Sequence, residues 1–328
     1  MHAPHTAPTG EKLRAALAGL LDGLPPTQAA QAVDRLIANY RGRVPTHTPV
    51  LRDRSDVAAY AAYRMPATFE AVRSALAAFR SRLPEWAPAT HVDLGGGTGA
   101  ATWAVAAAWP GGPQTTVVDW AAPALELGAE LARDVPELAG VQWRRQTIGD
   151  ELRIPDDTGL VTVSYVLNEL TEDGRRALTA QAARARAVLI VEPGTPDGYA
   201  RIIQAREQLI AAGFRVVAPC PHSAGCPIAE GTDWCHFSAR VSRSSLHRQV
   251  KGGSLAYEDE KFSYVAAIRE EPLPEAASRI VRRPQIRKGQ VLLELCTAED
   301  GLVRETVTKR HGERYRAARD ADWGDAWA

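Results

Sequence analysis

Long hydrophobic runs are absent from this chain of 328 residues. No stretch of about 18 apolar residues occurs, which argues against a membrane-spanning helix. The first ten residues, MHAPHTAPTG, lack the charged and then apolar pattern of a secretion signal. We therefore expect a cytoplasmic protein. In a reducing compartment, clustered cysteines bind metals more often than they form disulfides.

Lysine is scarce, with five lysines against 34 arginines, and the formal net charge is zero. A nucleic-acid-binding protein usually shows a basic patch, so such a patch must here be local. Residues 279–319 hold eleven Lys or Arg and five Asp or Glu, and a second basic stretch covers residues 240–251. Either a solvated face or RNA backbone binding explains these charges. The candidate RNA-binding residues are Arg240, Arg243, Arg248, Lys251, Arg282, Arg283, Arg287 and Lys288.

Cysteine is missing from the first 219 residues, and the whole chain has four: Cys220, Cys226, Cys235 and Cys296. Four thiolates can close a tetrahedral zinc site or hold a four-iron cluster. Their spacing differs from the two-residue knuckle of common zinc sites. His222 and His236 lie among them and could complete a mixed zinc site. A cluster, a zinc site and unrelated buried cysteines all stay open on spacing alone.

Short apolar stretches alternate with Ala-rich helical stretches from residue 90 onward. The predicted strands are 91–94, 114–119, 160–166, 187–193, 214–219 and 262–268, and the predicted helices are 100–109, 122–135, 172–185 and 199–213. Such alternation predicts an α/β fold with a doubly wound parallel sheet. The segment from Cys220 to Gly253 follows neither period.

The pattern divides the chain into three regions. We expect a helical N-terminal region (1–87), a Rossmann-like domain (88–270) with a Cys-rich insertion (219–253), and a small basic β domain (271–328). The last region contains a predicted hairpin whose turn lies at Glu299, Asp300 and Gly301.

A glycine-rich turn joins the first predicted strand to the next helix in HVDLGGGTGAATWAV. Gly95, Gly97 and Gly99 allow the backbone to approach a ligand, and Asp119 ends the next strand, where a carboxylate can bind ribose hydroxyls. The spacing also fits a dinucleotide site. Asp93 and the third glycine favour S-adenosylmethionine, since they complete the D-x-G-x-G-x-G pattern that this segment shares with class I methyltransferases.

Further residues extend this cofactor hypothesis. Trp120 could pack on the adenine, and Asp150 stands where an acid could approach the adenine amino group. The stretch SYVLNEL ends the fourth strand, so Tyr165, Asn168 and Glu169 are the catalytic candidates beside the transferable methyl. No residue stands out as a general base. Methyl transfer from a sulfonium depends mainly on proximity and alignment, so this leaves catalysis open.

Several stretches together resemble the methyltransferase-like assembly factors of the small ribosomal subunit, a family known from mitochondria with bacterial relatives. They include NYRGR, AYAAYRMPAT, VEPGTPDGYARIIQARE, APCPHSAGCPI, DWCHFSARVSRSSLHRQVKG, YEDEKFSYVA and RKGQVLLELCT. The resemblance covers the chain from about Asn39 to the final tryptophans. It implies a [4Fe-4S] cluster on Cys220, Cys226, Cys235 and Cys296, and binding to small-subunit rRNA during assembly.

We therefore expect a monomeric, ribosome-associated class I methyltransferase-like protein of the bacterial cytoplasm. It would bind S-adenosyl-L-methionine and 16S-type rRNA, and its structural cluster would tie Cys296 to the insertion. As an enzyme it would methylate rRNA. A non-catalytic assembly factor is the second hypothesis. A small-molecule methyltransferase with a structural zinc site is the third.

Overall fold

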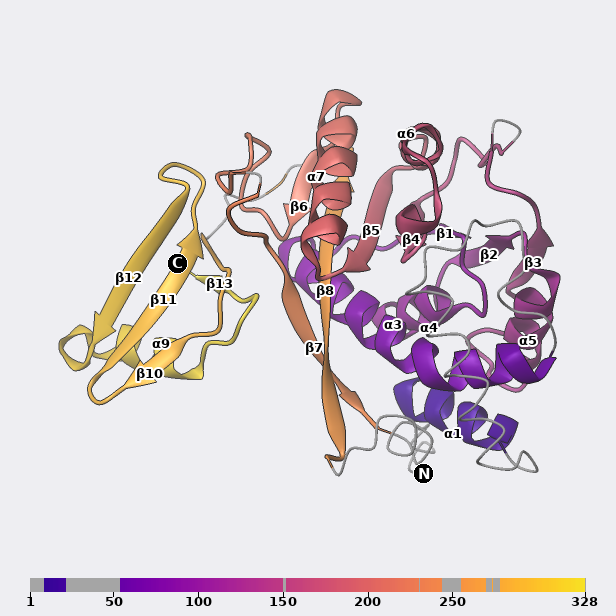
Figure 1. Ribbon diagram of the computed structural model, residues 1–328, viewed down its shortest axis with the longest axis horizontal. Coiled ribbons are helices and arrows are strands. Elements are labelled where there is room, and N and C mark those ends of the chain that lie inside the picture. Colours follow the sequence, from indigo (N-terminus) through magenta and orange to yellow (C-terminus); the bar gives the residue numbers. More distant parts are fainter. Residues whose placement is uncertain are drawn as a thin grey trace.

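The computed structural model describes residues 9–21, 54–149, 152–229, 231–243, 255–269, 273 and 278–327 (Figure 1). Its large sheet contains β1 (Thr90–Leu94), β2 (Gln114–Asp119), β3 (Gln142–Arg145), β4 (Leu160–Ser164), β5 (Ala187–Pro193), β6 (Arg215–Ala218), β7 (Phe237–Ser242) and β8 (Tyr257–Ile268). The strand order is β3-β2-β1-β4-β5-β8-β6, and β7 pairs with β8.

Strand direction identifies the fold class. The pairs from β3 to β5 are parallel, whereas β8 runs antiparallel to β5, β6 and β7. The order reverses between β1 and β4, which creates a topological switch point at the carboxyl ends of these two strands. A seven-strand order with one antiparallel strand near its edge is the class I methyltransferase topology. The predicted fold class is confirmed.

Helices cover both faces of the sheet. They are α1 (Thr9–Leu21), α3 (Arg54–Arg82), α4 (Ala100–Ala108), α5 (Ala122–Ala132), α6 (Glu172–Ala182) and α7 (Pro196–Ala211). Alternate residues of β5 divide the core: Leu189 and Val191 pack with α1, α3, α4 and α5, whereas Val188 and Ile190 pack with α6 and α7. A strand covered on both faces is largely apolar, as β5 is apart from the buried Glu192, which explains why β5 was recognisable in the sequence.

A second sheet forms the C-terminal unit (yellow in Figure 1). It contains β9 (Ser278–Ile280), β10 (Gln285–Arg287), β11 (Gln290–Cys296), β12 (Leu302–Thr308) and β13 (Ala326–Trp327), together with the 3-10 helix η2 (Lys309–His311) and α9 (Glu313–Asp320). The predicted hairpin is confirmed, because β11 pairs antiparallel with β12 and Gly301 takes a positive φ of 69° in the turn.

Two sequence expectations need adjustment. The segment from Cys220 to Gly253 is not irregular throughout, because residues 237–242 form β7. Its side chains alternate between buried and less buried positions, as expected for an outer strand. Strands β3, β9, β10 and β13 and helix α9 were not predicted. The region limits at residues 87 and 270 stay predictions. No helix in the described ranges is long and apolar enough to cross a membrane.

Candidate metal centre and cofactor loop

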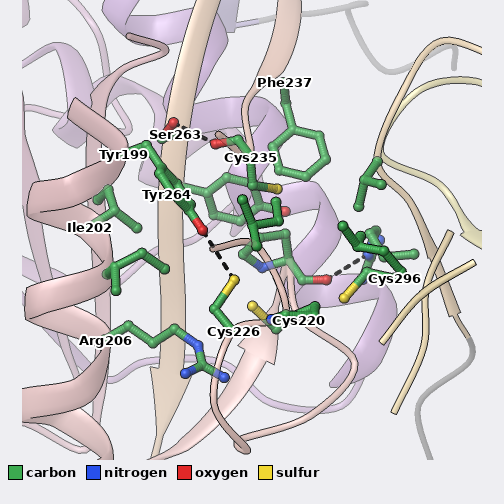
Figure 2. Close-up of a pocket in the computed structure, with 17 residues that line it drawn as sticks. Tyr199, Ile202, Arg206, Cys220, Cys226, Cys235, Phe237, Ser263, Tyr264 and Cys296 are labelled. Atoms are coloured by element: carbon green, nitrogen blue, oxygen red, sulfur yellow. Dashed lines mark hydrogen bonds between the residues drawn. The ribbon is translucent and has the colours of Figure 1, made fainter. Parts of the chain in front are cut away.

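All four cysteines line one pocket between the large sheet and the C-terminal unit (Figure 2). Cys220 and Cys226 lie in the loop after β6, Cys235 precedes β7, and Cys296 ends β11. The pocket therefore joins segments that are far apart in the sequence. None of the four forms a disulfide. The sequence predicted that Cys296 lies close to the Cys-rich insertion, and Cys296 does line the same pocket as the three cysteines of that insertion.

The pocket is held together by polar contacts around the sulfurs. The hydroxyl of Tyr199, on α7, lies 3.1 Å from the Cys226 sulfur, and the Ser263 hydroxyl donates to the carbonyl of Cys235 at 2.7 Å. The Nε2 atom of His222 lies 3.8 Å from the Cys296 sulfur. The turn of the β11–β12 hairpin also contacts the cysteine loop, where a Cβ built on Gly301 would lie 3.1 Å from the Pro227 side chain.

The thiols are in an environment that disfavours free thiolates. Burial raises the pKa of Cys296 to about 12, and the nearby Cys220 and Cys226 add to this rise. Burial and the other three cysteines raise the pKa of Cys235 well above its usual range. Burial also raises the pKa of Cys220, while Arg206 beside it acts in the opposite direction. Burial thus favours the neutral thiol at Cys220, Cys235 and Cys296, and a bound cation would favour the thiolate.

A single-ion site is not formed in the described part of the chain. No three His, Cys, Asp or Glu side chains there are close enough to share one metal ion. His236 is directed elsewhere, since its ring stacks on Trp234 at 5.2 Å and meets Trp323 edge-on at 4.9 Å. The mixed zinc site considered from the sequence thus finds no support in this geometry.

The glycine loop lies at the topological switch point. Gly95, Gly97 and Gly99 have φ values of 67°, 52° and 84°, a region that glycine adopts without steric cost. Asp119, at the end of β2, accepts hydrogen bonds from the backbone N–H of Gly97 (2.9 Å) and Ala121 (2.8 Å). The carboxylate therefore ties the glycine loop to the end of β2.

Asp93, on β1 just before the glycine loop, is buried and hydrogen-bonded. Its side chain is 0 % exposed and accepts hydrogen bonds from Thr162 (2.7 Å) and Thr102 (3.0 Å). The buried His91 lies 2.8 Å from the Thr162 hydroxyl. Burial raises the pKa of Asp93 to about 6 and lowers that of His91 to about 3. Each Asp93 oxygen thus accepts one hydrogen bond from a threonine, and its role in cofactor binding stays a prediction.

Of the two other predicted cofactor residues, the structure describes Trp120 but not Asp150. Trp120 is 46 % exposed beside Asp119, so its ring is available to an adenine. Asp150 lies outside the described residues.

The predicted catalytic residues follow β4, next to the glycine loop. Asn168 and Glu169 are exposed on the 3-10 helix η1 (Leu167–Glu169). Tyr165 has a positive φ of 61°, and its hydroxyl donates to Glu260 at 2.9 Å. Arg64, on α3, binds the same carboxylate oxygen at 3.1 Å. The ion pair therefore holds the Tyr165 side chain in place.

The predicted RNA-binding residues lie on two segments of the chain, which meet at Asp259. On the β7–β8 hairpin, Arg240 pairs with Asp259 at 3.3 Å, and Arg243 is 13 % exposed against Glu258. On the C-terminal unit, Arg282 pairs with Asp233 of the cysteine loop, and Arg283 lies 3.8 Å from Asp259. Arg287 and Lys288 are exposed. Arg248 and Lys251 lie outside the described residues.

Sequence reasoning missed three residues that the structure places at these sites. Glu260 is distant in sequence from Tyr165, and Arg206 and Arg279 border the cysteines. Nothing in the sequence distinguishes these arginines from the many others. Glu260 lies on β8, which begins at Tyr257. The sequence predicted this strand only from residue 262, so Glu260 fell just outside it.

The fold and the site define a class I methyltransferase-like protein with a four-cysteine pocket against a C-terminal β unit. The chain belongs to the family described as mitochondrial small ribosomal subunit Rsm22, whose match covers residues 54–328.

Two curated relatives illustrate the family. Ribosome assembly protein METTL17, mitochondrial, from Homo sapiens is 29% identical over 292 residues, which are 81% of this chain and 61% of that protein. Ribosome assembly protein RSM22, mitochondrial, from Saccharomyces cerevisiae is 23% identical over 226 residues, 44% of this chain and 36% of that protein. The chain thus spans less than two thirds of the length of these relatives.

Solved structures of similar fold are more distant. Magnesium protoporphyrin IX methyltransferase (ChlM) from Synechocystis PCC 6803 has a TM-score of 0.41 and 12% identity, covering 82% of this chain and 100% of that one. Precorrin-6y C5,15-methyltransferase from Geobacter metallireducens has a TM-score of 0.39 and 12% identity, covering 60% and 86%. The fold class rests on the strand order described above.

Proposed function

We propose that the protein is an assembly factor of the small ribosomal subunit that binds 16S-type rRNA. We further propose that it carries a [4Fe-4S] cluster on its four cysteines and S-adenosylmethionine at its glycine loop. The observation that carries the proposal is the convergence of every cysteine of the chain on one pocket. The family description and the names of the relatives support the ribosomal partner.

The donor set fits a cluster better than zinc. A four-iron cluster binds each thiolate through a different iron atom, so its sulfur ligands surround a core instead of meeting at one ion. The four cysteines line one pocket, and this shared lining supports the proposal. When bound, the cluster would supply iron–thiolate bonds that join the C-terminal unit to the cysteine loop. Cys220, Cys226, Cys235 and Cys296 would hold it.

The glycine loop supports the cofactor proposal. The loop glycines have positive φ values, Asp119 ends β2 beside them, and the exposed Trp120 follows it. These features support a ribose at Asp119 and an adenine at Trp120. The protein would hold the cofactor through Gly95, Gly97 and Asp119.

A non-catalytic variant of this function is favoured by one contact. Tyr165, which directly follows β4, donates its hydroxyl hydrogen to Glu260, and Arg64 of α3 pairs with the same carboxylate. The Tyr165 hydroxyl is therefore already engaged within the protein. Transfer of labelled methyl groups to small-subunit RNA decides between the two variants, since an assembly factor without transfer activity leaves the RNA unlabelled.

The metal centre and the partner are tested together. We expect protein purified without oxygen to be brown, to contain iron and sulfide, and to co-sediment with small-subunit particles at moderate salt. The substitution Cys296→Ser should lower the iron content and expose the C-terminal unit to protease, because this ligand is the one the unit contributes. Thr297→Ser, at the next position, is the matched control.

Two results would exclude parts of the proposal. A colourless protein with stoichiometric zinc would exclude the cluster. Failure to co-sediment with small-subunit particles would exclude the assembly function and favour a small-molecule methyltransferase.

A further inference from the structure

Two arginines are buried beside the cysteines without an acidic partner. Arg206, on α7, is 2 % exposed, and Arg279, on β9, is 3 % exposed. Both line the cysteine pocket. Among the described residues, neither has a carboxylate within ion-pair distance. Burial of an unpaired charge is costly, so these two cations need an anion in their surroundings.

Arg206 organises the loop between the first two cysteines. Its Nη2 atom donates to the backbone carbonyls of His222 (3.0 Å) and Ala224 (2.6 Å). Its Nε atom is buried and has no hydrogen-bond partner. Figure 2 shows the side chain directed toward Cys220 and Cys226. The two carbonyl oxygens accept hydrogen bonds from the guanidinium, but they carry no formal charge that would neutralise it.

Arg279 connects the same loop to the C-terminal unit. Its Nε atom donates to the carbonyl of Pro219 at 2.9 Å, and its Nη1 atom donates to the carbonyl of Gly324 at 2.7 Å. Pro219 immediately precedes Cys220, and Arg279 itself pairs with Cys296 across β9 and β11. One cation thus contacts both chain segments that contribute sulfurs.

The charges of the two arginines match those of the expected centre. A [4Fe-4S] cluster in its oxidised state carries two positive charges on its core, and four thiolates bring its total to two negative charges. We infer that Arg206 and Arg279 are the counter-cations of the metal centre: they neutralise the thiolate-bound cluster in a dry pocket and fix the loops that hold it. This inference rests on the proposed cluster. Both residues act through the cluster and its loops, so they are positioning residues.

The inference is tested on the full chain, purified without oxygen. Arg206→Gln and Arg279→Gln keep hydrogen-bonding capacity and remove one charge each, whereas Arg206→Lys keeps the charge. A nearby cation stabilises the more negative reduced cluster. We therefore expect each glutamine variant to have a lower midpoint potential by redox titration with EPR detection. Iron loss to a chelator should be roughly 10-fold faster or more, as for other outer-shell partners of metal ligands.

The controls separate charge from folding. Arg206→Lys should restore the potential toward that of the wild type. Arg269→Gln removes a guanidinium that donates to the carbonyl of Ala183 at 2.8 Å and does not line the pocket, so its potential should equal the wild-type value.

Three outcomes decide the matter. Lower potentials in both glutamine variants, with recovery in Arg206→Lys, support the inference. An intact cluster with unchanged potential in Arg206→Gln or Arg279→Gln overturns it and leaves the proposed function standing. Wild-type protein without iron overturns the proposed function and this inference with it.

Discussion

The carboxyl group of Asp93 offers a quantitative test of how the cofactor loop is built. We consider the substitution Asp93→Asn, which keeps the shape of the side chain and removes its charge. The amide oxygen can still accept from Thr162, and the Thr102 hydroxyl can rotate to accept from the amide nitrogen. The variant should therefore fold, and its stability should depend on pH differently from that of the wild type.

The direction of the pH dependence of stability follows from the raised pKa of Asp93. Burial raises the pKa of Asp93 from 3.8 to about 6, so the folded state binds a proton more tightly than the unfolded chain does. The stabilising contribution of that proton is complete below pH 3.8 and is lost as the pH rises through about 6. The shift corresponds to about 3 kcal/mol in total. Nearly half of this, on the order of 1 kcal/mol, is lost between pH 5 and pH 8.

The assay is scanning calorimetry of both proteins at several pH values from 5 to 8, without oxygen. The difference in Tm between Asp93→Asn and the wild type should grow in favour of the variant by roughly 2 °C across this range. His91 stays neutral in the folded protein here, because burial lowers its pKa to about 3. Glu126→Gln, at an exposed position of α5, is the control and should show a constant difference.

A constant difference between Asp93→Asn and the wild type would refute the reasoning, since it would mean that Asp93 titrates equally in the folded and unfolded states. A difference that shrinks with rising pH would show that hydrogen bonds from the threonines outweigh the cost of burial.

Two further predictions concern the cofactor loop and the basic surface. Gly95→Ala should weaken S-adenosylmethionine binding in calorimetric titration, because φ is 67° and the added Cβ would lie 2.5 Å from Val166, whereas Gly111→Ala, with φ of 84° and open space around it, should bind as the wild type does. Equal affinities of the two variants would contradict the assignment of the loop. Replacing Arg287 and Lys288 by Glu should weaken rRNA binding and make the plot of log affinity against log salt less steep, by about 1 for each phosphate that the protein no longer neutralises. An unchanged salt dependence would remove this surface from the interface.

The sequence predicted those elements whose burial is nearly complete. Strand β5 is apolar on both faces, and the inner half of β8 is buried residue after residue, so both appeared as continuous apolar stretches. Strand β7 was missed although Phe237, Ala239 and Val241 alternate with Ser238 and Arg240. The alternation of apolar and polar residues that is typical of a strand was present, but the preceding cysteines and prolines made the stretch resemble a loop.

The sites were predictable where they depended on rare residue types. Four cysteines in one half of the chain indicated a shared pocket, and the glycine spacing indicated the loop at the switch point. The charge environment was not predictable, because 34 arginines give no reason to select Arg206 or Arg279. Their burial depends on how α7, β9 and the cysteine loop pack together. The pairing of Arg240 and Arg243 with acidic residues of β8 likewise depends on the register of two strands.

The position of Cys296 at the end of β11 has a consequence for biosynthesis. During translation, strands β1 to β6 and their helices emerge before this cysteine does, so a nascent chain can form most of its core while the pocket still lacks one sulfur. Insertion of the proposed cluster would then follow only after synthesis has passed Cys296 and the β11–β12 hairpin has docked. Chains that stop earlier would be left with three crowded thiols, open to oxidation and to removal by proteases.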